Sequence, residues 1–210
     1  AVRGVAPLFE PGEGYGYTGT AYELLALVLD AATGDRIAAT QAEVNTPLGL
    51  TQTTQPRPSD PDPTGRVNAY WEIGGGRISN ISALQAKYDV QVIGAGNVRT
   101  TLTDALAFAD AVARGPLLSE ASRGEMQQWN PHSVDDDGYG YGLGLARREI
   151  DGATWVGHTG GDVGAGAFVF GRPDAELSVV GMTNLGMFLG GPLSELWNDE
   201  TLEEIVDLLE

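Results

Sequence analysis

The last third of the chain carries a series of short apolar runs, rich in β-branched and aromatic residues and separated by turn residues. Three such runs occupy residues 154–158, 167–170 and 177–182, and a proline-containing turn at residues 172–175 separates the last two. A fourth run, at residues 139–145, alternates large side chains with glycine, which is the period of two expected of a strand. Strands this close in sequence pair antiparallel, so the chain is predicted to contain an antiparallel meander.

The first two thirds of the chain predict helices instead. An apolar stripe at three- and four-residue spacing follows Thr18 and Thr20, either of which is suited to be the N-cap, and Gly34 ends the stripe. A second helix is predicted over residues 35–44. We expect it to end before Pro47, because the residue preceding a proline avoids the helical region.

Three further helices are predicted. One begins at Thr101 or Thr103 and ends before Gly115, and a short one is capped by Ser119 and reaches Trp129. The inner face of the first of these is predicted to be Leu102, Ala105, Leu106, Ala109, Val112 and Ala113. The end of the chain, over residues 193–209, has the apolar face and acidic opposite face of an amphipathic helix.

Helices followed by an antiparallel meander and a covering helix predict an α+β fold, with helices flanking an antiparallel sheet. The change from helical to strand patterns divides the chain into a mainly helical region, residues 1–134, and a region of strands with a C-terminal helix, residues 135–210. We expect the two regions to form one structural unit, since 210 residues suit one sizeable domain.

Composition excludes several classes of function. The formal net charge of −17, from 29 acidic and 12 basic residues, repels phosphate backbones and anionic lipid, so no nucleic-acid partner is expected. No run approaches the roughly 20 apolar residues of a membrane span. The chain has no cysteine and only two histidines, His132 and His158, which excludes thiolate chemistry and a histidine-rich metal site. No metal or cofactor is predicted.

The segment at residues 157–161, Gly-His-Thr-Gly-Gly, lies between two predicted strands and is the first candidate site. Glycines let a substrate approach the main chain closely, and the backbone N–H groups can then point at an oxyanion. His158 and Thr159 would place polar side chains beside the same substrate site.

Tyr17 is the second candidate. It precedes a predicted helix cap and lies in a loop held by Pro11 and several glycines. A phenol has an unperturbed pKa of about 10, and it can act as a general base if cations or hydrogen-bond donors lower that pKa. A packed aromatic side chain is the alternative interpretation of Tyr17 on its own.

Several segments, in the same order along the chain, resemble the serine β-lactamase-like hydrolases. That superfamily includes class C β-lactamases, penicillin-binding DD-peptidases, D-aminopeptidases and related esterases. The matching segments are Phe9-x-Pro11-Gly12, Tyr17-Thr18-Gly19-Thr20-x-Tyr22, Pro47-Leu48-Gly49-Leu50-x-x-Thr53, Gly94-Ala95-Gly96 with Thr100 and Asp104, Tyr139-Gly140-Tyr141-Gly142-Leu143-Gly144, and Gly157-His158-Thr159-Gly160-Gly161. Each segment is weak alone, but together they span nearly the whole chain.

The resemblance implies roles for the candidate residues. In the superfamily the nucleophile is the serine of a Ser-x-x-Lys helix, and its proton is shuttled by the lysine and a tyrosine. Tyr17 would be that tyrosine, and residues 158–160 would line the acyl site. The N–H of Gly161 would complete an oxyanion hole with the N–H of the serine. The superfamily also favours an extracellular or periplasmic location, while the composition leaves the compartment open.

Two departures from the pattern matter. Gly19 stands where the tyrosine motif often has asparagine, which favours ester or small amide substrates over β-lactams or peptidoglycan. The chain also has no Ser-x-x-Lys, because Lys87 is its only lysine and Leu84 precedes it by three residues. We therefore expect this chain to be the C-terminal portion of a serine hydrolase, lacking the N-terminal strands and the nucleophile helix.

The expected partner is an N-terminal chain or segment that carries the nucleophilic serine. The expected substrate is a small molecule or peptide with an ester, amide or D-amino-acid linkage. Two alternatives stay open: a non-catalytic domain that binds a ligand or protein, and a Ser/His/Asp hydrolase that uses His158. If the chain belonged to a Ser/His/Asp hydrolase, His158→Gln would abolish activity. If a tyrosine carries the proton, as the resemblance implies, His158→Gln would only impair activity.

Overall fold

The computed structural model describes residues 4–57, 59–60, 65–135, 138–186, 204–205 and 207–208. Its helices are α1 (Gly19–Thr33), α2 (Arg36–Thr40), a π-helical turn η1 (Gln41–Asn45), α3 (Thr46–Leu48), α4 (Ser82–Asp89), α5 (Leu102–Ala113) and α6 (Glu120–Met126). Its strands are β1 (Tyr70–Glu72), β2 (Ile78–Asn80), β3 (Gly140–Tyr141), β4 (Ala146–Ile150), β5 (Ala153–Asp162), β6 (Ala165–Gly171) and β7 (Ser178–Thr183).

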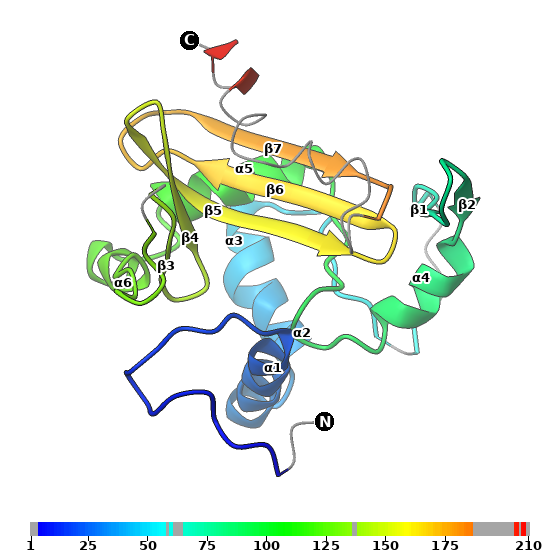
Figure 1. Cartoon of the computed structure of the whole chain (residues 1–210), viewed down its shortest axis with the longest axis horizontal. Coiled ribbons are helices and arrows are strands. Elements are labelled where there is room, and N and C mark those ends of the chain that lie inside the picture. The colour runs from blue at the N-terminus through cyan, green and yellow to red at the C-terminus, as the bar shows by residue number, and fades with distance from the viewer. Residues whose placement is uncertain are drawn as a thin grey trace.

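The predicted α+β class is confirmed. Strands β3 to β7 form one antiparallel sheet in sequence order, and β1 and β2 form a separate hairpin. Figure 1 shows α5 behind the sheet, α1 and the N-terminal segment below it on the side of β5, away from β7, and the hairpin with α4 to its right. Among the described residues no helix is long and apolar enough to cross a membrane.

The core lies on β4 to β7. Its members are Ile150, Trp155, Phe168, Phe170 and Val179, with Ile205 packed against them. Helix α5 approaches the sheet closely because the facing residues are small. A Cβ at Gly171 would lie only 2.8 Å from the Cβ of Ala113 and 3.1 Å from the carbonyl oxygen of Ala109. Close packing of this kind leaves no room for a larger residue at Gly171.

Helix α1 has the boundaries that its capping residues predict. The Thr18 side chain accepts a hydrogen bond from the N–H of Thr20, and Gly34 ends the helix in the left-handed conformation with φ of 82°. Ala26 is its only buried residue among those described, while the apolar residues around the rest of its circumference are exposed. They are Leu24, Leu25, Leu27, Val28 and Leu29.

The prediction that a helix stops before Pro47 is wrong. The π-helical turn η1 continues from α2, and α3 places Pro47 in its first turn. Proline is tolerated there because the first N–H groups of a helical segment have no intrahelical acceptor. The helix ends at Gly49, which is left-handed with φ of 68°.

The strand predicted over residues 139–145 is shorter than expected. Only β3 is extended, and Gly144 has a φ of 78°, so the following glycines make the turn into β4. Strand β4 was not predicted, because its Arg147, Arg148 and Glu149 lack an apolar alternation. Helix α4 and strand β2 were not predicted either.

The predicted inner face of α5 is partly wrong. Ala105, Ala109, Val112 and Ala113 are buried, but Leu102 and Leu106 are exposed, and Asp104 is buried in their place. The helix turns its small residues to the sheet, because only these allow the close approach at Gly171. The helix predicted over residues 193–209 lies outside the described residues, apart from a few positions near its end.

The hydrogen bonds of Asp104 explain why the segment that contains Thr100 has an aspartate at this position. Its carboxylate accepts the N–H of Gln52 at 2.8 Å and the hydroxyl of Thr53 at 2.8 Å, which ties α5 to the segment after α3. Asp104→Ala is expected to lower the free energy of unfolding by about 1–3 kcal/mol, because the N–H of Gln52 and the hydroxyl of Thr53 both lose their acceptor. Urea unfolding measures this loss. The matched variant Asp110→Ala, on the same helix but with a side chain 51% exposed, is expected to cost below about 1 kcal/mol. Equal losses would contradict the assignment.

Candidate active site

Tyr17 and His158, 141 positions apart in sequence, meet at one end of the sheet. Their ring centroids are 5.7 Å apart, and the ring planes are inclined by 40°. His158 lies in β5, and Tyr17 lies just before the Thr18 cap of α1. The two segments that the sequence analysis singled out therefore share one site.

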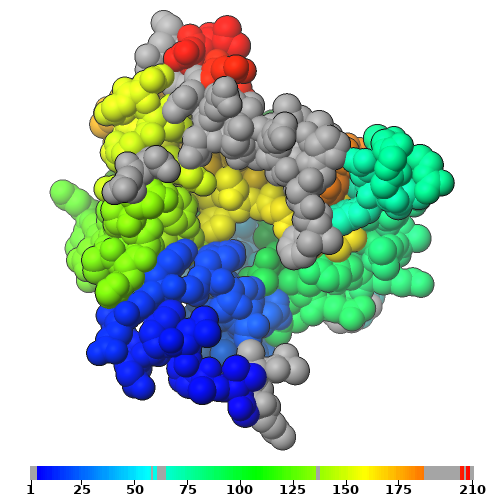
Figure 2. Space-filling view, viewed as in Figure 1, coloured from blue at the N-terminus to red at the C-terminus, as the bar shows by residue number. Residues whose placement is uncertain are grey.

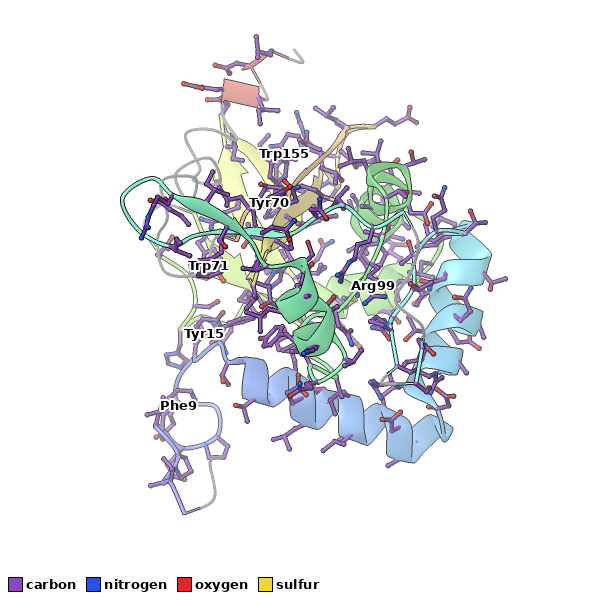
Figure 3. The ribbon with its side chains drawn as sticks, turned by 90° about the vertical axis from the view of Figure 1, so that its right-hand side faces the viewer. Phe9, Tyr15, Tyr70, Trp71, Arg99 and Trp155 are labelled. Atoms are coloured by element: carbon purple, nitrogen blue, oxygen red, sulfur yellow. The ribbon has the colours of Figure 1, made fainter. Side chains whose placement is uncertain are left out.

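The loop that leads to Tyr17 is shaped by glycine and Phe9. The Phe9 ring lies so close to Gly14 that a Cβ there would be 2.5 Å from ring carbons. Figure 3 shows Phe9 in the N-terminal loop and Tyr15 where that loop turns towards α1. The alternation of glycine and tyrosine over residues 14–17 thus gives the loop a tight path and still supplies two phenols.

Tyr141 joins the two sides of the site through hydrogen bonds. Its hydroxyl lies 2.9 Å from Nε2 of His158, and it also bonds the hydroxyl of Tyr22, on α1. Nδ1 of His158 bonds the carbonyl oxygen of Thr159. Tyr22 and Tyr141 were not proposed as site residues from the sequence. The available signal was that both lie within the segments that resemble the superfamily.

Tyrosines surround this network. Tyr15 and Tyr17 each lie with a ring centroid 5.6 Å from that of Tyr141, and the Tyr15 hydroxyl lies 3.4 Å from that of Tyr139. Burial is the main cause that raises the pKa of Tyr17 above its ordinary value, and the neighbouring Tyr22 and Tyr139 add to it. Burial likewise raises the pKa of Tyr15 and of Tyr141.

These pKa directions bear on the sequence-based hypothesis that Tyr17 is a base. That hypothesis required cations or donors that lower its pKa, and none of the causes acting on Tyr17 is a cation. Near neutral pH Tyr17 is therefore a neutral phenol in this structure. A cation placed beside its hydroxyl would be needed to make it a base.

One edge of β5 is open beside His158. Strand β4 pairs with β5 only as far as Gly157, whereas β6 pairs along the other edge from Val156 to Asp162. From His158 to Asp162 the described strands leave one edge of β5 without a partner. Backbone groups along such an edge are free to hydrogen-bond an extended ligand.

Glycines keep this open part of β5 uncovered. Thr159, Gly160 and Gly161 are all exposed, and a Cβ built at Gly160 would have Ala167 as its nearest neighbour, at 4.0 Å. Gly160 faces the same side of the strand as His158, since side chains two residues apart share a face. In Figure 2 the yellow surface of the central strands lies next to the blue surface of the N-terminal segment and α1.

Gly19 contacts a different part of the molecule. A Cβ at Gly19 would lie 3.3 Å from the Cβ of Ala95, in the loop after α4. The carboxylate of Glu23 holds that loop against α1, because it accepts the N–H groups of Ile93, Gly94 and Ala95. The small residue at position 19 therefore lets the loop pack against the start of α1.

The described residues hold no cluster of three or more histidine, cysteine, aspartate or glutamate side chains that could bind a metal ion. His132 lies in a turn, and its N–H bonds the side chain of Asn130. It takes no part in the network around His158.

The order and geometry of these segments agree with a known family. A model of the family described as Beta-lactamase matches residues 1–189. The chain belongs to the β-lactamase family. Its fold is that of the serine hydrolases in this family, with penicillin-binding proteins and D-amino acid amidases among its structural neighbours.

Three solved structures illustrate the likeness of fold. A D-stereospecific amidohydrolase from a Streptomyces species is 24% identical, with a TM-score of 0.74 over 86% of this chain and 53% of that one. A penicillin-binding protein from Bacillus halodurans is 23% identical, with a TM-score of 0.75 over 98% of this chain and 60% of that one. A D-amino acid amidase from Ochrobactrum anthropi SV3 is 18% identical, with a TM-score of 0.75 over 96% and 60%. The present chain therefore spans little more than half the length of these β-lactamase-family structures.

Proposed function

We propose that this chain is the C-terminal part of a serine hydrolase that works through an acyl-enzyme. A segment bearing Ser-x-x-Lys, absent from these 210 residues, supplies the nucleophile. The substrate is an ester, an amide or a D-amino-acid peptide. The D-stereospecific amidohydrolase and the D-amino acid amidase among its structural neighbours favour an amide or ester of this kind.

The observation that carries this proposal is the position of Tyr17 beside an open strand edge. Tyr17 contacts His158, and the exposed glycines of β5 follow immediately along that strand. An acyl group that pairs with the open edge would place its carbonyl oxygen near the N–H of Gly161, which offers one donor of an oxyanion hole. Thr159 and Gly160 would line the acyl group.

The missing nucleophile also agrees with the electrostatics of Tyr17. Burial and neighbouring tyrosines raise its pKa, so it needs a nearby cation to accept a proton at neutral pH. The lysine of a Ser-x-x-Lys helix, placed next to the Tyr17 hydroxyl, would supply that charge. The same helix would bring the serine hydroxyl that Tyr17 deprotonates.

The exposed apolar surface of α1 supports an additional segment. Leu24, Leu25, Leu27, Val28 and Leu29 are each between 41% and 63% exposed. An apolar surface around more than half of a helix is unusual in water and favours packing against another element. We propose that the nucleophile-bearing segment packs on this side of α1, adjacent to Tyr17.

Labelling of the protein from its native source tests the proposal. An intact-mass measurement and peptide map would first identify any segment associated with these 210 residues. A fluorophosphonate probe is then expected to modify one serine, in a Ser-x-x-Lys sequence of that segment, and none within this chain. A native product of these residues alone, or a labelled serine within them, would contradict the proposal.

A non-catalytic binding domain is the second candidate, and the absent nucleophile favours it. Such a domain would keep the open edge of β5 as a ligand site but form no covalent adduct. Penicillin and fluorophosphonate labels separate the two candidates, because covalent modification of the native assembly excludes the binding domain.

A further inference from the structure

We propose that Tyr141 is a positioning residue of this site: its hydroxyl donates to Nε2 of His158, whose Nδ1 proton is bound by the Thr159 carbonyl, and so fixes the ring beside Tyr17 and the open edge of β5. The hydrogen-bond geometry carries the tautomer assignment. The effect on turnover rests on the proposed function.

The partners of His158 determine the direction of each hydrogen bond. The carbonyl oxygen of Thr159 can only accept, so Nδ1 of His158 carries the proton and donates it. In a neutral imidazole Nε2 is then an acceptor, and it lies 2.9 Å from the Tyr141 hydroxyl, which must donate. The Tyr141 oxygen in turn accepts from the hydroxyl of Tyr22. The chain of donors runs from Tyr22 through Tyr141 to His158 and ends at Thr159.

This arrangement leaves His158 no free ring nitrogen. Both nitrogens are used within the protein, so a neutral His158 can neither take a proton from a nucleophile nor bond a substrate without breaking one of these contacts. His158 therefore lines the site, and the orientation of its ring matters. This agrees with a mechanism in which a tyrosine, and not the histidine, carries the proton.

Tyr141 is held firmly enough to impose that orientation. The residue is 6% exposed, its N–H donates to the hydroxyl of Ser133 at 2.8 Å, and its carbonyl oxygen accepts from the N–H of Asn130 at 2.8 Å. Its ring meets that of His158 edge-on, at a centroid distance of 5.5 Å and an angle of 89°. A buried residue fixed at backbone and side chain can orient its neighbour at little entropic cost.

Tyr141 also links the two segments that form the site. Tyr22 lies one helical turn into α1, the helix that follows Tyr17, and His158 lies on β5. The Tyr141 hydroxyl contacts both. Loss of this hydroxyl should therefore loosen His158 relative to Tyr17 without removing either side chain.

Nitrogen NMR of histidine tests the assignment in the assembled protein. With ¹⁵N-labelled histidine this chain contributes two residues, and the signals that disappear in His132→Gln and in His158→Gln assign them. At a pH well above the ordinary imidazole pKa of about 6.5, wild-type protein is expected to show Nδ1–H and an unprotonated Nε2. Tyr141→Phe is expected to keep the Nδ1–H tautomer, which the Thr159 carbonyl selects, but to shift the Nε2 resonance of His158, because Nε2 loses its hydrogen-bond donor. Tyr139→Phe, a neighbour outside the chain of donors, should leave the His158 spectrum unchanged.

A second variant keeps the test decisive if Tyr141→Phe folds poorly. Tyr22→Phe removes the far donor but retains the Tyr141 hydroxyl, so the Nε2 resonance of His158 should stay at its hydrogen-bonded, wild-type position. The Nε2–H tautomer in wild-type protein, or an unchanged His158 spectrum in Tyr141→Phe, would overturn the inference. These outcomes are independent of whether the protein hydrolyses anything.

Turnover provides the functional readout. If the assembly is acylated by a chromogenic ester, Tyr141→Phe is expected to slow acylation by about 10- to 100-fold, through a displaced His158. His132→Gln, outside the network around His158, should slow it by less than about threefold. An unchanged acylation rate in Tyr141→Phe, with the Nε2 resonance shifted, would show that orienting His158 does not matter for the reaction and would overturn the positioning role.

Discussion

Tyr17→Phe is expected to slow acylation of the assembled enzyme by about 10²–10⁴-fold, the usual contribution of a positioned proton acceptor. The change removes one hydroxyl that has no hydrogen-bond partner among the described residues, and the ring stays in contact with His158. Binding of the substrate should therefore change little, and the loss should fall on kcat. Single-turnover acylation by a chromogenic ester measures it directly.

The same variant should leave stability nearly unchanged, because Tyr17 is 53% exposed. Tyr15→Phe is the matched control, since Tyr15 belongs to the same loop and contacts the same Tyr141 ring. We expect its acylation rate to stay within about threefold of wild type. A Tyr17→Phe enzyme with normal kcat would exclude Tyr17 as the proton carrier.

His158→Gln distinguishes this mechanism from a Ser/His/Asp hydrolase. If Tyr17 carries the proton, His158→Gln should impair acylation less than Tyr17→Phe does, since it removes a wall of the site and not the base. Complete loss of activity in His158→Gln with activity retained in Tyr17→Phe would favour the histidine mechanism instead.

Gly157→Ala is expected to lower the free energy of unfolding by about 3 kcal/mol or more. A Cβ at Gly157 would lie 1.9 Å from the carbonyl oxygen of Val169 and 2.8 Å from the Cα of Phe170. Both contacts are to backbone of the paired strand β6, which cannot move aside as a flexible side chain could. The sheet must therefore shift or separate at this position.

Gly160→Ala is the control for this prediction, on the same strand and three residues away. Its new Cβ would meet only Ala167, at 4.0 Å, which is an ordinary van der Waals contact. We expect a change within about 0.5 kcal/mol, and urea unfolding of the two variants compares them under identical conditions. Equal losses in both variants would show that Gly157 is not a close-packing position.

The three glycines of this motif therefore serve different purposes, and the sequence alone did not separate them. From the sequence, the glycines of the motif were expected to let a ligand approach the main chain. The position of β6 restricts that purpose to Gly160 and Gly161, because Gly157 is filled by the backbone of its neighbour.

Local signals predicted the elements whose ends are set by neighbouring residues. Thr18 and Gly34 bound α1, and Thr101 bounds α5, because a cap satisfies backbone groups within a few residues of itself. Strand β4 escaped prediction because its charged residues are stabilised by pairing with β3 and β5. The continuation past Pro47 depended on a π-helical turn, which no local signal indicated.

The sequence by itself determined the α+β class, the family, the two segments that carry Tyr17 and His158, and the absence of Ser-x-x-Lys. Each of these depends on residue type and order within short segments. The tertiary structure decided that Tyr141 and Tyr22 connect those segments, that the described strands leave the edge of β5 open beyond Gly157, and that the apolar surface of α1 is exposed among the described residues. These are contacts, or missing contacts, between residues far apart in the chain, and they follow from how the sheet and helices pack together and not from the local preferences of any segment.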